Sequence, residues 1–183
     1  MSVAPRRTRW YAGLGAALAR RRVRLGFLSA AVVLWLAEPT SRSVTWGAIV
    51  AAIGELIRIW AAGHVEKSRE VTRSGPYRFT RHPLYLGSSI IGIGIAVASA
   101  SWLAAALVFG YLAAAITAAI RAEEAYLREK FGGDYDAYAA RTAAPMIRSF
   151  SAARARANRE HHTIAGLIVA LLLLAFKVGY SIR

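Results

Sequence analysis

The chain has 183 residues, of which 56% are hydrophobic, yet it carries 24 Lys and Arg against 10 Asp and Glu, a formal net charge of +14. A mean hydropathy of +0.37 with such a basic excess is unusual in a cytosolic enzyme and typical of a polytopic membrane protein with arginine-rich cytoplasmic loops. Because the sequence contains no cysteine, it excludes disulfides, thiolate metal sites and a cysteine nucleophile.

The N-terminal residues combine a basic front with an apolar run over residues 25–37. A cleaved signal peptide would also show this pattern. The run ends at Glu38-Pro39 without a small-x-small cleavage site, which favours a retained membrane anchor. The run is short for a span, and snorkelling of Arg24 would lengthen it.

Four further apolar segments follow, at residues 44–62, 84–98, 102–120 and 163–180. No Asp, Glu, Lys or Arg lies between Arg81 and Arg121, an interval that accommodates two spans of about 20 residues. The small residues at 99–101 form the turn between these two spans. The sequence therefore predicts an all-α polytopic membrane bundle of about five transmembrane helices.

The segments between the spans are also patterned. Residues 121–140 are rich in Ala, Glu, Arg and Leu and predict a helix that continues out of the fourth span. Gly132-Gly133 should end this helix, and residues 135–138 should begin a second turn. We divide a single membrane domain (1–183) into N-terminal spans (1–62), a core (63–147), a linker (148–162) and a C-terminal apolar span (163–183).

Arginine asymmetry predicts the orientation. Seven arginines and no acid precede residue 25, five basic residues lie in 63–81, and eight lie in 121–162. The opposite turns, at 38–43 and 99–101, hold one basic residue between them. By the positive-inside rule, the N-terminus and both long loops are cytoplasmic, as in a bacterial inner-membrane protein.

Charged residues inside the second span are the first candidate site. Glu55 and Arg58 are three residues apart, so on a helix they share a face and can pair. An arginine in mid-membrane costs about 2.5–3.5 kcal/mol on insertion scales and should therefore face protein or a wet cavity. A structural ion pair and a role in substrate binding are equally compatible with the pattern.

The second candidate is the stretch GPYRFTRHPLYLG at residues 75–87, directly before the charge-free interval. Pro83 suits the first position of a helix, where its missing N–H would be unbonded anyway. The N–H groups of a helix start favour anions, and the basic and aromatic side chains cluster there: Tyr77, Arg78, Arg81, His82 and Tyr85. An interfacial belt of arginines and tyrosines gives the same composition.

Other motifs are weaker. Glu123-Glu124 follow the fourth span and are compatible with a solvated helix face, with binding of a cation or with a hydrogen bond to a ribose. Because neighbouring helical residues point about 100° apart, the pattern does not favour a matched acid–base pair or a bridged dimetal site. Gly92 and Gly94 indicate close helix packing, and His161-His162 indicate an interface pair. The sequence lacks GxGxxG after a strand, a P-loop and GxSxG, so nucleotide-fold and hydrolase hypotheses have no support.

Together the entry motif, the two following spans and the segment RAEEAYLREKFGGDYDAY, followed by Pro145, resemble membrane-integral methyltransferases. The resemblance covers about residues 63–147 and is greatest to the isoprenylcysteine carboxyl methyltransferase family and its bacterial relatives, with phospholipid N-methyltransferases as cousins. The cousins carry a GxG upstream, which the comparable stretch IGELIRIWAAGH lacks. This favours the carboxyl-methylating branch or a bacterial branch with another acceptor.

The resemblance implies S-adenosylmethionine as the cofactor and a lipid or lipidated acceptor, with no nucleic acid as partner and no metal. It also implies the site residues. The cofactor pocket would comprise Val71, Tyr77, His82, Pro83, Leu84, Tyr85, Glu123 and Glu124; Arg81, Arg121 and Glu124 would be catalytic, with Arg121 holding an anionic acceptor group.

The residues bear on the reaction as well. A carboxylate acceptor is already a nucleophile, whereas an amine must first lose a proton. Since the sequence offers no dedicated base, it favours carboxyl O-methylation. The alternatives are a phospholipid N-methyltransferase, an NADPH-dependent lipid or steroid-type reductase, and a non-enzymatic component whose arginines bind anionic lipids.

Overall fold

The computed structural model describes residues 25–181, and every regular element among them is helical. The elements are a short helix Leu25–Leu36, α2 (Ser41–Ala62), the 3₁₀ turn η1 (Gly75–Arg78), α3 (Pro83–Ser99), α4 (Trp102–Phe131), α5 (Gly133–Ala139), α6 (Ala152–Ala157) and α7 (Glu160–Ser181). The predicted all-α fold is confirmed over this part of the chain.

Three helices, α2, α4 and α7, are long and apolar enough to cross a membrane. The helix Leu25–Leu36 and α3 are apolar but shorter. Large apolar side chains point outward from these helices, with Trp102 92% exposed and Trp35 79% exposed, as a lipid-facing surface requires. The described helices are those of a membrane protein, and the count of five spans stays a prediction.

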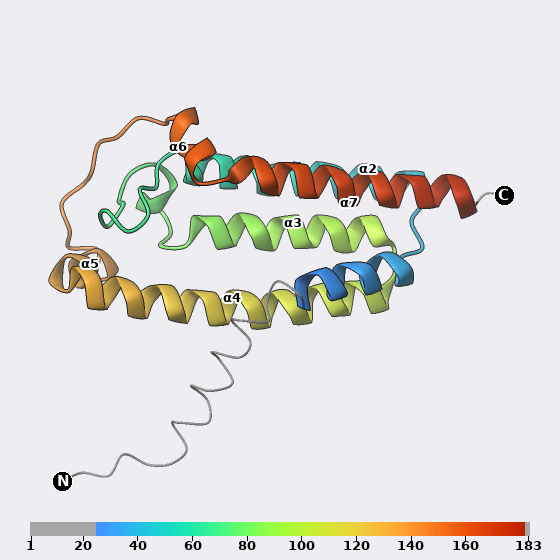
Figure 1. The fold of residues 1–183 in the computed structure, drawn as a ribbon, viewed down its shortest axis with the longest axis horizontal. Helices are drawn as coiled ribbons and strands as arrows, with labels where there is room; N and C mark the ends of the chain where they lie inside the picture. Colours follow the sequence, from blue (N-terminus) through green and yellow to red (C-terminus); the bar gives the residue numbers. More distant parts are fainter. Residues whose placement is uncertain (1–24, 182–183) are drawn as a thin grey trace, which may run out of the picture.

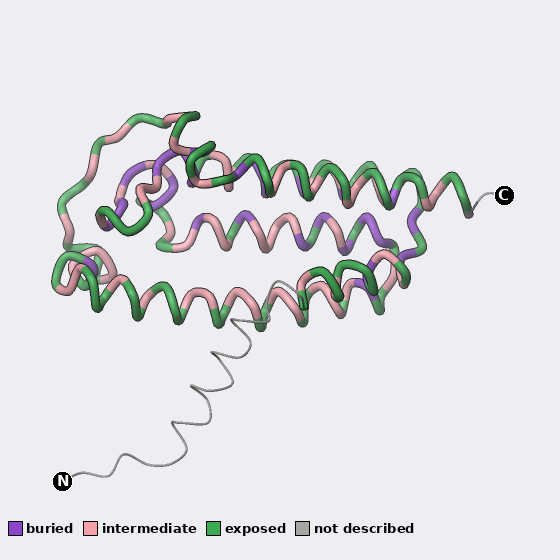
Figure 2. The backbone as a smooth tube through the Cα atoms, in the orientation of Figure 1, coloured by how far each residue is buried: buried purple, intermediate pink, exposed green. Residues whose placement is uncertain are grey.

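The long helices α2, α3, α4 and α7 run side by side, with α3 between α4 and the α2–α7 pair (Figure 1). The 63–82 loop, α5, the 140–151 segment and α6 gather at one end of this bundle. Buried residues are concentrated along α3 and in the 63–82 loop, whereas the residues of α4 and α7 are mostly exposed or half-buried (Figure 2). The polar loops thus form a compact cap on one end of an apolar bundle.

Helix boundaries follow the signals in the sequence. Thr40 and Ser43 form a capping box at the start of α2, and Pro83 occupies the first turn of α3. The predicted continuation of the fourth span is confirmed, since α4 runs unbroken to Phe131 and ends where Gly132 takes a φ of +49°. α5 starts immediately afterwards, as the tyrosine pattern predicted.

Close packing of α2 against α3 depends on small residues. A Cβ at Gly94 would lie 2.6 Å from the Ala51 nitrogen and 2.6 Å from the Gly47 carbonyl oxygen. A Cβ at Gly54 would lie 2.7 Å from the Gly87 carbonyl oxygen. Without side chains the two backbones touch directly, which is how helices associate in lipid. The packing role predicted for Gly94 is confirmed.

We expect Gly94→Val to destabilise the bundle, because the two backbones must separate to admit the side chain. Overpacking of this kind costs about 1–3 kcal/mol. The matched control is Gly110→Val in α4, since nothing lies within 4 Å of a Cβ there. Thermal unfolding in detergent should show a lower Tm for Gly94→Val alone; equal effects of the two substitutions would contradict direct backbone contact.

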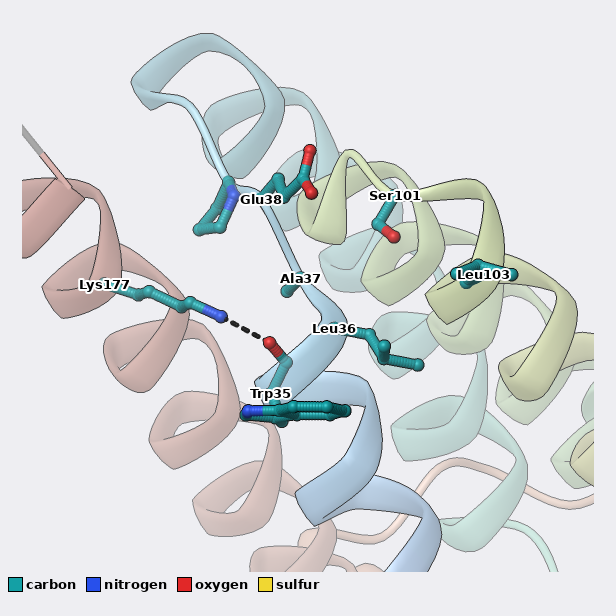
Figure 3. A pocket seen from close by; sticks show the side chains of 8 residues that line it. Trp35, Leu36, Ala37, Glu38, Ser101, Leu103 and Lys177 are labelled. Carbon is teal, nitrogen blue, oxygen red and sulfur yellow. Dashed lines mark hydrogen bonds between the residues drawn. The ribbon is translucent and has the colours of Figure 1, made fainter.

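The other end of the bundle is closed by short polar contacts. The Glu38 N–H donates to the Ser99 carbonyl at 2.8 Å, which ties the two predicted turns together. The Lys177 ammonium donates to the Leu34 and Trp35 carbonyls, each at 2.8 Å, and so satisfies carbonyls in the last turn of the helix Leu25–Leu36. Figure 3 shows the bond to Trp35. A shallow hollow of about 490 Å³ lies beside these contacts.

Part of the segment predicted as a linker is helical instead. α6 lies within it, and α7 begins at Glu160, so His161 and His162 belong to the first turn of α7. Ser151 caps α6 by accepting the Arg154 N–H. The prediction failed here because α6 has six residues and no apolar periodicity, and contacts with distant parts of the chain hold it in place.

The predicted pairing of Arg58 with Glu55 is present, but Arg58 has a closer partner that the sequence did not indicate. Its Nε is 3.9 Å from Glu55 Oε2 but 2.7 Å from Oε1 of Glu160, which is 102 residues away. Arg58 further donates to the Leu84 carbonyl at 3.3 Å and to the hydroxyl of Thr163 at 3.2 Å. The arginine therefore joins α2, α3 and α7, and this supports the structural interpretation of the buried charge.

Candidate functional site

A cavity of about 180 Å³ lies at the capped end of the bundle. Three segments form its walls: the 63–82 loop, the last turns of α4, and α5. The lining residues are Val65, Glu66, Lys67, Ser68, Glu70, Val71, Thr72, Tyr77, Arg81, Glu123, Tyr126, Leu127, Tyr135 and Tyr138. The wall is thus mainly polar and aromatic, with acids outnumbering basic residues.

Local structure brings these side chains together. η1 turns the chain so that Tyr77 is buried at the cavity wall. The Tyr138 hydroxyl donates to the Tyr77 carbonyl at 2.8 Å, which fixes α5 against η1. Arg128 pairs with Asp136 at 3.6 Å and lies 5.5 Å from the centre of the Tyr135 ring, so α5 folds back onto α4. The tyrosine tail thereby closes one side of the cavity.

Glu124 connects the entry motif to the end of α4. Its Oε1 accepts from His82 Nε2 at 3.1 Å and lies 3.2 Å from an Arg81 nitrogen. Its Oε2 lies 3.6 Å from Arg128. One carboxylate thus holds three cationic or donor groups from two segments. The entry motif and the paired glutamates, 42 residues apart in sequence, meet in space as the hypothesis requires.

The two neighbouring glutamates face different surroundings. Glu123 lines the cavity, whereas Glu124 points to His82 and Arg81 beside it. This is the divergence expected of consecutive helical residues. Glu123 therefore has a carboxylate available to a ligand in the cavity, and Glu124 holds the wall in place.

The remaining predicted site residues lie at different distances from the cavity. Val71, Tyr77, Arg81 and Glu123 line it. Pro83, Leu84 and Tyr85 form the first turn of α3, and the Tyr85 ring lies 5.9 Å from that of His82. Arg121 is exposed on α4 and is absent from the lining of this cavity.

Sequence reasoning missed several wall residues. Tyr126 and Leu127 follow Glu123 by three and four positions, so helical spacing alone would have placed them on the same face. Tyr135 and Tyr138 were recognised as a motif but were not assigned to the pocket. Glu66 and Glu70 gave no signal, because an irregular loop has no periodicity from which to infer facing.

Burial controls the chemistry of the tyrosines. It raises the pKa of Tyr77 far above its ordinary value, and the nearby Glu123 adds to this effect. Burial together with the neighbouring Tyr135 raises the pKa of Tyr138 to about 12. Both hydroxyls are therefore neutral at physiological pH, and they act as hydrogen-bonding and aromatic groups rather than as bases.

An apolar groove of about 330 Å³ lies between α3 and α4. It is lined by Ser89, Ile93, Phe109, Leu112, Ala113, Ile116 and Thr117. The Ser89 hydroxyl donates to the Tyr85 carbonyl at 3.0 Å, so the groove begins one turn along α3 from the His82–Tyr85 segment. Thr117 and Arg121 are four residues apart on α4, which places Arg121 one turn beyond the groove on the same face.

Comparison with known proteins gives two matches. Residues 43–134 match the family described as phospholipid methyltransferase. The nickel-cobalt-cadmium resistance protein NccN of Alcaligenes xylosoxydans xylosoxydans is 34% identical over 100 residues, which cover 54% of this chain and 45% of that protein. The chain thus spans less than half the length of this relative. No solved structure matches the chain significantly.

Proposed function

The chain belongs to the phospholipid methyltransferase family, and on this basis we propose that it transfers a methyl group from S-adenosylmethionine to an amphiphilic acceptor in the membrane. The observation that carries the proposal is the meeting of the entry motif with the paired glutamates, through the 3.2 Å and 3.1 Å contacts of Glu124 with Arg81 and His82. These contacts stand beside a cavity that is lined mainly by charged and aromatic residues, at the end of an apolar bundle.

The residues of the cavity suit the cofactor. The cofactor supplies a methyl group on a positively charged sulfur, and acids and aromatic faces favour such a cation. Glu66, Glu70 and Glu123 provide the acids, while Tyr77 and Tyr138 provide aromatic walls. Val71, buried beside them, would contribute backbone contacts.

The cavity is smaller than a typical small-molecule site. Small-molecule sites generally measure about 300–1,000 Å³, and this cavity measures about 180 Å³. Binding of a whole nucleoside cofactor therefore requires one wall to move outward. The 65–72 loop is the wall without helical structure, so it is the part that would move.

The acceptor would approach from the membrane. Its apolar chain would occupy the groove between α3 and α4. The end of this groove at Ser89 lies next to the His82–Tyr85 segment. Arg121, one turn beyond the groove on α4, would hold an anionic group of the acceptor. In this arrangement the reacting group reaches the cavity sideways, without leaving the lipid.

The finer proposal is carboxyl O-methylation of an isoprenylcysteine-like or other lipid acceptor. A carboxylate attacks without prior deprotonation, and the neutral tyrosines offer no base for an amine. The new bond joins the acceptor oxygen to the methyl carbon as the carbon–sulfur bond breaks. The role of the protein is alignment of the two partners, which can supply several kcal/mol.

The orientation belongs to the same proposal. The arginine-rich loops that form the cap would face the cytoplasm, where the cofactor is made, in a bacterial inner membrane. The five apolar helices would then all cross the bilayer, the two shorter ones with help from flanking residues.

Methyl transfer in a defined mixture tests the function. Purified protein is incubated with S-adenosylmethionine that is labelled in its methyl group. The acceptors are a bacterial lipid extract and prenylated peptides that are added to it. Label should enter the lipid phase and be released as methanol by mild base, the behaviour of a methyl ester. Base-stable label would refute carboxyl methylation in favour of amine methylation, and no transfer to any lipid would refute the activity itself.

A further inference from the structure

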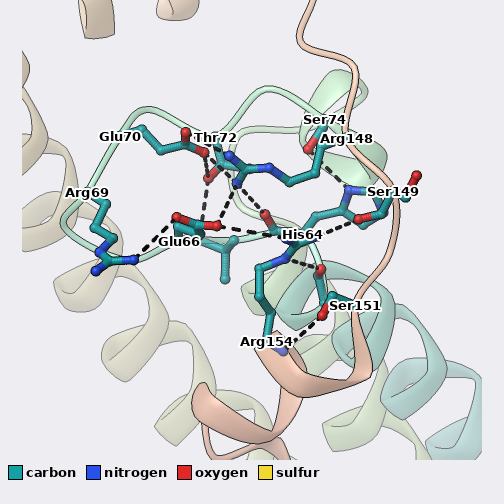
Figure 4. Close-up of polar contacts among 12 residues, drawn as sticks. His64, Glu66, Arg69, Glu70, Thr72, Ser74, Arg148, Ser149, Ser151 and Arg154 are labelled. Carbon is teal, nitrogen blue, oxygen red and sulfur yellow. Dashed lines mark hydrogen bonds and ion pairs between the residues drawn. The ribbon is translucent and has the colours of Figure 1, made fainter.

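One wall of the cavity is held from behind by a segment outside the family match. The 65–72 loop supplies half of the residues that line the cavity. Residues 148–158, which we name the strap, bind this loop and the chain leading into it, as Figure 4 shows for Arg148 and Arg154. The strap lies beyond residues 43–134, and none of its residues lines the cavity.

Arg148 makes the central contacts of the strap. One guanidinium nitrogen lies 2.6 Å from Glu70 Oε1, and the other donates to Glu70 Oε2 at 2.8 Å. Arg148 also donates to the His64 carbonyl at 3.2 Å and lies 3.7 Å from Glu66. Paired contacts between arginine and carboxylate are strong and directional, so they fix the loop as well as attract it.

The rest of the strap anchors the base of the loop. Arg154 donates to the Gly63 carbonyl at 2.8 Å and lies 3.8 Å from Glu66. The Asn158 amide donates to the carbonyls of Ala62 at 2.9 Å and Val65 at 3.0 Å. These bonds satisfy the C-terminal carbonyls of α2 and fix the point at which the loop leaves the helix.

The Glu66 and Glu70 side chains lie between the cavity and the strap. Glu66 and Glu70 line the cavity, and both lie within ion-pair distance of Arg148. The strap therefore sets the position of these acids and offsets part of their negative charge. The cavity wall that has to move for a nucleoside to enter is the wall that these arginines restrain.

We propose that Arg148 and Arg154 are positioning residues, which act through Glu66 and Glu70 to set the shape and charge of the cofactor cavity. The inference rests on the proposed function for the identity of the ligand. It adds a part of the chain that the family match does not include, and it assigns to the strap the control of loop opening.

The test compares Arg148→Ala and Arg148→Lys with Arg156→Ala, a control in the α6 part of the strap. The Arg156 side chain is exposed and forms no hydrogen bond or ion pair with the described residues. Hydrogen exchange of the 65–72 amides reports the loop, and calorimetric titration with S-adenosylhomocysteine reports the cavity. Arg148→Ala should speed loop exchange about tenfold and weaken binding about tenfold, with exchange in α2 and α3 unchanged. Arg148→Lys should recover part of both, and Arg156→Ala should resemble the wild type.

Four outcomes would overturn the inference. Unchanged loop exchange in Arg148→Ala would show that the strap does not hold the loop. Faster loop exchange with unchanged affinity would show that the loop does not shape the site. Faster exchange throughout α2 and α3 would show that Arg148 has a general structural role. The same conclusion would follow if Arg148→Ala failed to fold while Arg148→Lys kept the loop exchange and the affinity of the wild type. Wild-type protein that binds no S-adenosylhomocysteine would refute the proposed function, and the exchange rates would still decide whether the strap holds the loop.

Discussion

Substitution of Glu124 by Gln should lower kcat/KM for methyl transfer roughly 10- to 100-fold. Glu124 holds Arg81, His82 and Arg128 at 3.1–3.6 Å, and the amide retains the shape but loses the charge that draws them together. Hydrogen bonds to charged groups contribute about 1.5–3 kcal/mol, and 1.4 kcal/mol corresponds to tenfold. Released from Glu124, Arg81 and His82 would no longer hold the cavity wall against α4.

Steady-state kinetics with labelled cofactor measures this effect, and Glu129→Gln is the matched control. Glu129 is exposed on the same helix and forms no ion pair within the described chain. Its replacement should leave the rate unchanged. Equal rates for Glu124→Gln and wild type would show that the junction between the entry motif and α4 is unimportant for catalysis.

Substitution of Glu160 by Ala should lower the free energy of unfolding by about 3–5 kcal/mol, the range found when one partner of a buried ion pair is removed. The Arg58 side chain is 16% exposed and the Glu160 side chain 6% exposed, so solvent cannot replace the lost carboxylate. The remaining partners of the guanidinium are neutral apart from Glu55, whose nearest oxygen is 3.9 Å away.

Equilibrium unfolding in detergent measures this loss, and the double variant Arg58→Leu/Glu160→Leu isolates its cause. Removal of both charges leaves no uncompensated arginine, so the double variant should be more stable than Glu160→Ala. A double variant that is less stable than the single one would indicate that the pair itself, rather than the stranded charge, supplies the stability.

Features set by local sequence could be predicted. Pro83 at a helix start and Gly132 at a helix end act within one turn, so α3 and the end of α4 were placed correctly. The role of Gly94 in close packing also follows from residue type, since small residues in apolar helices mark contacts with neighbours. Neighbouring glutamates on one helix diverge by geometry alone, and Glu123 and Glu124 do so.

Features set by contacts between distant segments could not be predicted. The pairing of Arg58 with Glu160 needs α7 beside α2, and nothing in either helix indicates that arrangement. The strap resembles a linker in composition because its order comes from arginine contacts with a loop 78 to 91 residues away. The same limitation hid Glu66 and Glu70, whose placement depends on how that loop is tethered.

Calorimetric titration of the folded protein in detergent with S-adenosylhomocysteine determines whether the cavity at the capped end binds the product form of a methyl-donating cofactor. We expect saturable heat that corresponds to one site per chain, with weaker binding in Glu124→Gln and wild-type binding in Glu129→Gln. Absence of heat from folded protein would refute binding of this cofactor, and thermal stabilisation by NADPH instead would favour the reductase alternative.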